Sequence, residues 1–125
     1  MHTTNYRDTL ITVSADCPVP GGTIPEKLGT IATVQHALLA EPYKLTSDDL
    51  LFETHRARGG EKSRAEFFAK PQACLRASPL VKQFGWGIHH DGDGRVALVD
   101  PQGADYRRLL GDGSVRKTPG MRSKR

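Results

Sequence analysis

A proline- and glycine-rich stretch at residues 16–29, DCPVPGGTIPEKLG, constrains the fold of this chain more than any other feature. It holds three prolines and three glycines. Proline cannot donate a backbone hydrogen bond, and glycine loses the most conformational entropy when it is fixed in a helix or strand. We therefore predict a long ordered loop or flap here. The 125 residues of the chain suffice for one domain and not for two with separate cores.

Regular patterns begin on both sides of this loop. Residues 9–14, TLITVS, are β-branched and alternate in polarity, which predicts a strand. After the loop, Thr30 can cap a helix that runs to about residue 40, and Pro42 ends it. One face of this helix is apolar and consists of Ile31, Val34, Leu38 and Leu39.

The segment TSDDLLFETHRAR at residues 46–58 is compatible with two structures. Thr46 and Asp49 have the spacing of a capping box, and acidic residues suit the N-terminus of a helix. Residues 50–57 can also form a strand that follows a polar turn. We predict the strand.

Short elements with clear ends follow. Ser63 and Glu66 form a second capping box, which predicts a short helix that stops at Pro71. Residues 72–77 are predicted to be extended. Residues 79–84 are predicted to form one helical turn, because proline is tolerated at the first helical position.

The last third of the chain predicts a hairpin and a helix. The runs WGIHH and RVALVD flank DGDG, a glycine-rich connection that is typical of a β-hairpin. A helix then begins at Asp100 and Pro101. Its apolar stripe includes Tyr106 and Leu109, and Gly111 ends it.

The predicted order is therefore β-α-β-α-β-β-α. Strands do not alternate strictly with long helices, and the last two strands form a hairpin. We expect a single α+β domain over residues 1–111, with a mostly antiparallel sheet of about four strands and helices packed on one face.

Charge separates the end of the chain from its body. The net charge is +4, yet residues 1–110 hold equal numbers of basic and acidic side chains, so the excess lies at the end. Residues 112–125 are predicted to form a basic disordered tail, because they are dense in charge and carry no apolar stripe. Such a tail can hold nucleic acid through its phosphates.

The two cysteines and the start of the chain predict the cellular compartment of the protein. Cys17 and Cys74 are the only thiols, and no secretory signal or membrane-length apolar run is apparent. We expect a cytoplasmic protein with two free thiols and no contact with a membrane.

Three separated blocks carry a resemblance to a known family. The patterns NYxxTxIxVxxDCPV, PYKxTSDDLLF and CLRASPLVKxFGWGIHxDxxGxxAL, spread over roughly residues 3–110, resemble domain-of-unknown-function family 6157 (DUF6157), small bacterial proteins with no assigned activity. The resemblance implies a single cytoplasmic domain, agrees with a strand at residues 50–57, and supplies no catalytic residue. The run RASPLVKQFGW is also similar to a segment of the MmcQ/YjbR-like proteins, a fold associated with DNA binding.

The spacing of histidine, cysteine and acidic residues does not predict a metal site or a cofactor. Neither CxxC nor HExxH occurs. His89 and His90 are neighbours on a predicted strand, so their side chains point to opposite faces. The DGDG run resembles the start of a calcium loop, but Gln102 stands where the closing glutamate is needed, so we interpret the run as a hairpin turn.

Residues 73–90, ACLRASPLVKQFGWGIHH, remain the candidate site. Arg76 is its centre, because a guanidinium can bind a carboxylate or phosphate with a planar pair of donors. The alternative is structural: Arg76 pairs with Asp48 or Asp49. The predicted ligand-binding residues are Arg76, Lys82, His89, Cys74 and Trp86.

These features leave three functions open. The first is a binding or interaction domain, a monomer or homodimer, for a small anionic ligand or a protein partner. The second is a nucleic-acid-associated protein that uses the basic tail. The third is a small enzyme that uses Cys74 or His89, with His89 or His90 as the base that activates the thiol. The catalytic residues are not determined by the sequence, and a non-enzymatic role is favoured.

Overall fold

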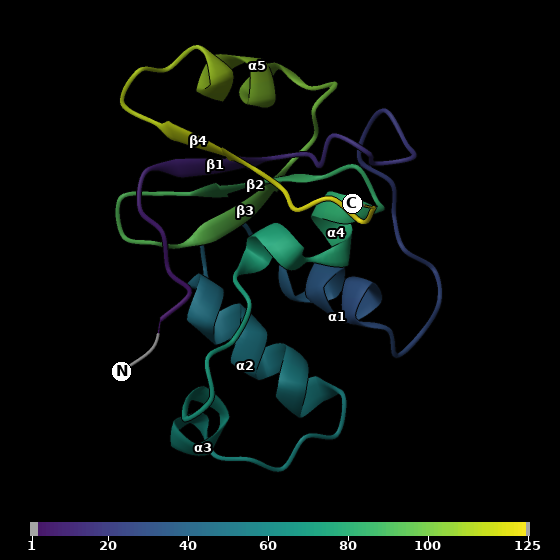
Figure 1. The fold of residues 1–125 in the computed structure, drawn as a ribbon, viewed down its shortest axis with the longest axis vertical. Coiled ribbons are helices and arrows are strands. Elements are labelled where there is room, and N and C mark those ends of the chain that lie inside the picture. Colours follow the sequence, from purple (N-terminus) through teal and green to yellow (C-terminus); the bar gives the residue numbers. More distant parts are fainter. Residues whose placement is uncertain (1–2, 125) are drawn as a thin grey trace.

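A four-stranded mixed sheet forms the centre of the protein, seen in a computed structural model that describes residues 3–124 (Figure 1). Its strand order is β3-β2-β1-β4. The strands are β1 (Thr9–Thr12), β2 (Gly87–His90), β3 (Val96–Val99) and β4 (Arg116–Pro119). β4 runs parallel to β1, whereas β1 with β2 and β2 with β3 are antiparallel. The predictions of an α+β class and of a mostly antiparallel sheet are confirmed.

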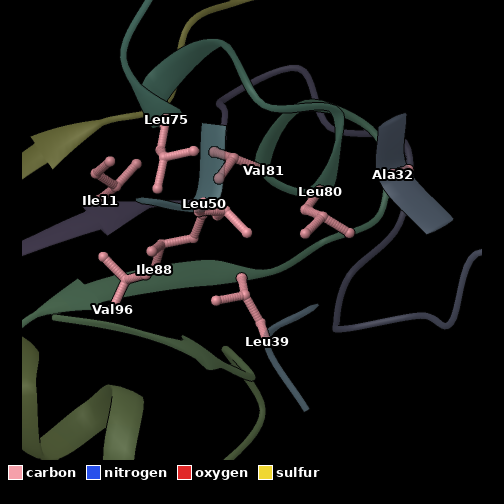
Figure 2. Packing of buried hydrophobic residues seen from close by; sticks show 9 residues of the cluster. All are labelled: Ile11, Ala32, Leu39, Leu50, Leu75, Leu80, Val81, Ile88 and Val96. Carbon is pink, nitrogen blue, oxygen red and sulfur yellow. The ribbon is translucent and has the colours of Figure 1, made fainter. Parts of the chain in front are cut away.

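Most helices cover one face of this sheet (Figure 1). They are α1 (Ile31–Leu38), α2 (Ser47–Ala57), α3 (Arg64–Phe68) and α4 (Pro79–Lys82), and a 3₁₀ turn, η1 (Leu75–Ala77), precedes α4. The main core lies between this layer and the sheet (Figure 2). Its members are Ile11, Ala32, Leu39, Leu50, Leu75, Leu80, Val81, Ile88 and Val96.

α5 (Ala104–Leu110) lies on the opposite face (Figure 1). Alternate residues of a strand point to opposite faces, so Leu10 meets Tyr106 and Leu109 in a second core while Ile11 enters the first. The expectation that all helices pack on one face is therefore wrong. β1 and β3 carry apolar residues at consecutive positions, so both faces of the sheet have an apolar core against them.

Residues 50–57 form most of α2 and not a strand. The hydroxyl of Thr46 accepts from the backbone N–H of Asp49 at 3.1 Å, and the Asp49 carboxylate accepts from the backbone N–H of Thr46 at the same distance. This capping box starts a helix whose positions Leu50 and Thr54, one turn apart, are buried. The local helix signal prevails, and the buried positions Ser47, Leu50 and Thr54 recur at helical spacing.

The structure also differs from the predicted disordered tail. Within its described part, residues 112–124, the chain forms β4 at the edge of the sheet. The side chain of Lys117 turns back and donates to the carbonyl oxygens of Asp112 and Val115. Backbone pairing with β1 orders this segment, and its charged side chains lie outside the core.

Several other predictions from the sequence are confirmed. The capping box of Ser63 and Glu66 opens α3, and the hairpin is β2 and β3. The last helix is α5, but it begins at Ala104 and not at Asp100, because residues 101–103 form a turn. Residues 72–77 are not extended throughout, because η1 occupies 75–77. Among the described helices, none has the length and apolarity needed to cross a bilayer.

Candidate functional site

A groove runs along the side of α1 that carries Ile31 and Gln35. It consists of three adjoining hollows of about 320, 240 and 220 Å³, and Ile31 lines all three. Arg58 is shared by the first and second, and Gln35 by the second and third. The groove therefore extends from the loop before α1, past the end of α2, to the segment before α4.

The first turns of α1 present the floor of the groove. Thr30 caps the helix by accepting from the backbone N–H of Thr33 at 3.3 Å. Ile31 and Gln35 are four residues apart, so they lie on the same side of the helix, one above the other. Ile31 is 39% exposed, which is high for a large apolar side chain at the centre of a concave surface.

The proline- and glycine-rich loop supplies one wall. Its Thr23 pairs with Phe84 through the backbone, at 2.8 Å. The indole N–H of Trp86 donates to the carbonyl oxygen of Thr23, also at 2.8 Å. Gly22 lies against the indole so closely that a Cβ atom there would come within 2.8 Å of the ring. The loop is thus held at a fixed place, and its Pro25 and Lys27 line the groove.

The groove is basic. Its lining includes Lys27 and Arg58 and no aspartate or glutamate. Arg58 is oriented by a hydrogen bond from Nε to the carbonyl oxygen of Gly29, at 3.1 Å. Neither cation belongs to an ion pair within the described part of the chain. Both charges are thus available to an anion in the groove.

A buried polar pair lies beneath the groove. The hydroxyl of Ser78 donates to Oε1 of Gln35 at 2.6 Å, and Ser78 Oγ accepts from the backbone N–H of Leu80 at 3.2 Å. Gln35 is only 2% exposed, yet it lines two of the hollows. The pair also fixes α1 against the start of α4.

Two rings line the middle hollow, those of His55 near the end of α2 and of Phe67 in α3. His55 lies 4.9 Å from the ring of Phe67 and 6.3 Å from that of Phe52, measured between centroids. Nε2 of His55 accepts from the backbone N–H of Lys62 at 3.3 Å, so Nδ1 carries the proton of the neutral ring. The middle of the groove therefore has two aromatic rings in its wall.

Of the five predicted site residues, Cys74 alone lines the groove, at its far end. Its sulfur lies 3.2 Å from the hydroxyl oxygen of Tyr6, and burial together with this thiol raises the pKa of the tyrosine. Arg76 points elsewhere. Its Nε donates to the carbonyl oxygen of Pro119, at 2.7 Å, and not to a carboxylate.

The other three predicted residues are dispersed. Lys82 ends α4, half-buried, and Trp86 packs against the loop and the ring of His36. His89 faces the side of the sheet that α5 covers, where Nδ1 lies 2.8 Å from the hydroxyl oxygen of Tyr43. Burial lowers the pKa of His89.

His90, which the sequence offered only as a possible base for Cys74, lies in the core. It is fully buried, and within the described residues neither ring nitrogen has a hydrogen-bond partner. Its ring meets that of Tyr6 edge-on, with centroids 5.3 Å apart. Burial disfavours the charged ring and lowers the pKa to about 4. His90 is therefore neutral at pH 7.

A wider hollow of about 520 Å³ lies beside β1 and β4 but is a weaker candidate. It is lined by Arg7 and Arg116 together with Asp8, so its charges partly neutralise each other. Sequence reasoning missed the groove residues Arg58 and Gln35. The signal for Gln35 was present, because it sits beside the apolar stripe of α1, where an amide is unusual.

Comparison with known families gives one result. The family described as "Family of unknown function (DUF6157)" matches residues 1–125. The chain belongs to this family. The match includes every wall of the groove, so the groove is part of the DUF6157 domain itself. Comparison with curated proteins gave no match, and neither did comparison with solved structures.

Proposed function

We propose that this DUF6157 domain binds a small anionic ligand with an apolar part, in the groove over α1. The observation that carries the proposal is the combination of apolar walls with two cations and no acid in the lining. Concave apolar sites with a few polar groups are typical of small-ligand binding. The charge of Arg58 and Lys27 selects for an anion.

The position of the charges suggests how such a ligand lies. Arg58 is tied to Gly29, just before the first turn of α1, and can hold an acid group there with its remaining N–H donors. The apolar part then lies over Ile31 and toward Leu51 and Phe67, which line the middle hollow. Each apolar group moved from water into this hollow contributes roughly 25 cal/mol per Å² of buried surface.

Binding of three probes tests the proposal by calorimetry. Octanoate carries the acid and the chain, 1-octanol the chain alone, and acetate the acid alone. We expect octanoate to bind most tightly, and Arg58→Gln to weaken octanoate about tenfold while leaving octanol unchanged, as for loss of one charge-assisted contact. Arg58→Lys keeps the charge and retains part of the affinity.

Arg107→Gln is the matched control, because Arg107 is exposed on α5, on the opposite face of the sheet, and is not a member of an ion pair in the described chain. It is expected to bind octanoate as the wild type does. Equal weakening by Arg107→Gln, or no preference for octanoate over octanol, would contradict the proposal.

The other two functions have less support. The basic residues of β4 belong to an edge strand, and the ammonium of Lys117 is engaged by two backbone carbonyls. For an enzyme, Cys74 needs an adjacent base. Its hydrogen-bond partner is the hydroxyl of Tyr6, while the nitrogens of His90 have none among the described residues.

A further inference from the structure

Only the oxygen of the Gln35 side-chain amide has a hydrogen-bond partner among the described residues. Its oxygen accepts from the hydroxyl of Ser78, at 2.6 Å. Its Nε2 donates to no residue that the structure describes, although the side chain is 98% buried and lines the middle and far hollows of the groove. Because Nε2 opens onto these hollows, water can be its partner while the groove is empty, and a ligand that covers Nε2 must offer an acceptor or leave it unpaired.

The surrounding hydrogen bonds fix the orientation of this amide. Ser78 Oγ already accepts from the backbone N–H of Leu80, so its own proton is directed to Gln35. The amide oxygen is therefore turned toward Ser78. The two N–H bonds of Nε2 are left facing the groove, the one open space that Gln35 lines.

We propose that Gln35 recognises a hydrogen-bond acceptor on the ligand, so that the ligand is a carboxylate whose chain carries a carbonyl oxygen. This inference rests on the proposed function. Gln35 would give the ligand a second polar contact, on the other side of Ile31 from Arg58. A role in ligand recognition would also explain why a polar side chain occupies a buried position on α1.

The spacing of the two contacts limits the ligand. Arg58 is anchored at Gly29, and Gln35 lies one helical turn beyond Ile31. At a rise of about 1.5 Å per residue, the acid group and the acceptor are roughly 6–9 Å apart. A carbonyl directly beside the acid, as in a 2-oxo acid, is too close to reach both residues.

The physical reason for selectivity is the unmade hydrogen bond. A ligand without the acceptor leaves the Gln35 donors buried and unpaired when it displaces water from the groove. Sites built to bond a polar group discriminate strongly against analogues that lack it, whereas apolar contacts alone discriminate weakly. Gln35 would thus distinguish oxygenated from plain fatty acids.

The test compares monomethyl suberate with decanoate, which has the same number of chain atoms but no ester carbonyl. The measured quantity is the ratio of the two Kd values, decanoate over ester. We expect this ratio to fall about fivefold or more in Gln35→Leu/Ser78→Ala, which removes both partners of the buried pair, since one hydrogen bond is lost. Ser78→Ala alone keeps the amide and should keep the ratio within about twofold of the wild type.

A second variant separates the hydrogen bond from polarity. Gln35→Glu keeps an acceptor for Ser78 and a polar floor but has no donor at pH 8, so it should weaken both ligands and still lower the ratio. If the ratio falls in the leucine variant and not in the glutamate variant, only apolarity matters and the inference is overturned. An unchanged ratio in both variants overturns it as well.

Failure of the proposed function looks different. In that case Arg58→Gln leaves the affinity for decanoate unchanged, whatever happens at Gln35. A further outcome is that Arg58→Gln lowers the affinity for both probes while the Gln35 variants leave the ratio of Kd values unchanged. In that case the groove binds carboxylates, and Gln35 does not donate a hydrogen bond to the ligand. Circular dichroism of each variant establishes that it is folded before its affinity is compared.

Discussion

Nε of Arg76 donates to the carbonyl oxygen of Pro119 at 2.7 Å, which ties the end of β4 to the turn before α4. The backbone reinforces this contact, since the N–H of Met121 donates to the carbonyl oxygen of Arg76 at 2.8 Å. On the other side, Gly120 pairs with Thr12 of β1. The last strand is therefore held between β1 and the helical layer.

Arg76→Met should lower the free energy of unfolding by about 1–2 kcal/mol, because one solvent-exposed hydrogen bond is lost. Methionine keeps much of the packing of the arginine stem and removes its donors. Urea denaturation measures the change. A loss near 4 kcal/mol would instead indicate a buried ion pair, as the structural hypothesis for Arg76 requires.

The same hypothesis named Asp48 and Asp49 as partners, and both are engaged elsewhere. The Asp48 carboxylate accepts from the backbone N–H and the hydroxyl of Thr4, while Asp49 accepts from Arg64 at 2.8 Å. The effects of Arg76→Met and Asp48→Ala should therefore add within about 0.5 kcal/mol. A larger coupling energy between Arg76 and Asp48 would contradict this arrangement.

Deletion of residues 114–125 should lower Tm by about 10 °C or more, because it removes β4 and the contacts of Arg76 with it. Deletion of residues 122–125 is the control. The described residues it removes, 122–124, are exposed, and their backbone bonds go to the carboxylate of Asp16. It should change Tm by less than about 2 °C. Equal Tm values for the two truncated proteins would show that β4 does not support the fold.

His90→Leu should stabilise the protein by about 1–3 kcal/mol at pH 7, because it removes a buried ring whose nitrogens have no partner among the described residues. Leucine has a similar volume and suits the main core that this face of β2 enters. Urea denaturation at pH 7 measures the gain. A loss of stability would show that the ring makes a contact that leucine cannot replace.

The same variant should flatten the pH dependence of stability. The pKa of His90 is lowered to about 4 in the folded protein, against an ordinary value near 6.5. Between these values the unfolded chain binds a proton that the folded protein does not, so stability falls as the pH falls through this range, by about 3 kcal/mol. Urea titrations at pH 7 and pH 4 should show this difference between wild type and variant.

Trp86→Phe should loosen the loop before α1, because it removes the donor to Thr23 and leaves most of the ring's packing. We expect trypsin to cleave faster after the exposed Lys27, within this loop. Cleavage after Lys62, in the loop between α2 and α3, is the internal control and should be unchanged. Equal acceleration at both sites would indicate global destabilisation rather than local release.

The sequence predicted those elements whose signals are local. The cap of Thr30, the capping box of Ser63 and the glycine-rich turn at 91–94 each act within a few residues, and each element formed where it was expected. At residues 46–58 the local signal was again correct, and the prediction failed because an apolar run was weighed above the capping box of Thr46.

Contacts between distant segments were not predictable in this way. The order of β4 depends on pairing with β1, and the partner of Arg76 is a backbone carbonyl that no side-chain pattern reveals. The groove is formed by three separate segments, so its residues are not neighbours in sequence. Of the groove residues, only Cys74 was predicted as a site residue. A thiol is a candidate nucleophile wherever it occurs in a sequence, whereas a glutamine has no such chemistry.

The place of β1 has a consequence for the order in which the chain is made. It is the first strand to leave the ribosome, yet both strands that flank it, β2 and β4, lie in the last third of the chain. Until they emerge, Leu10 and Ile11 have no sheet to join, and the nascent chain carries an unpaired apolar strand. The sheet of this domain can therefore close only when the last third of the chain has been made.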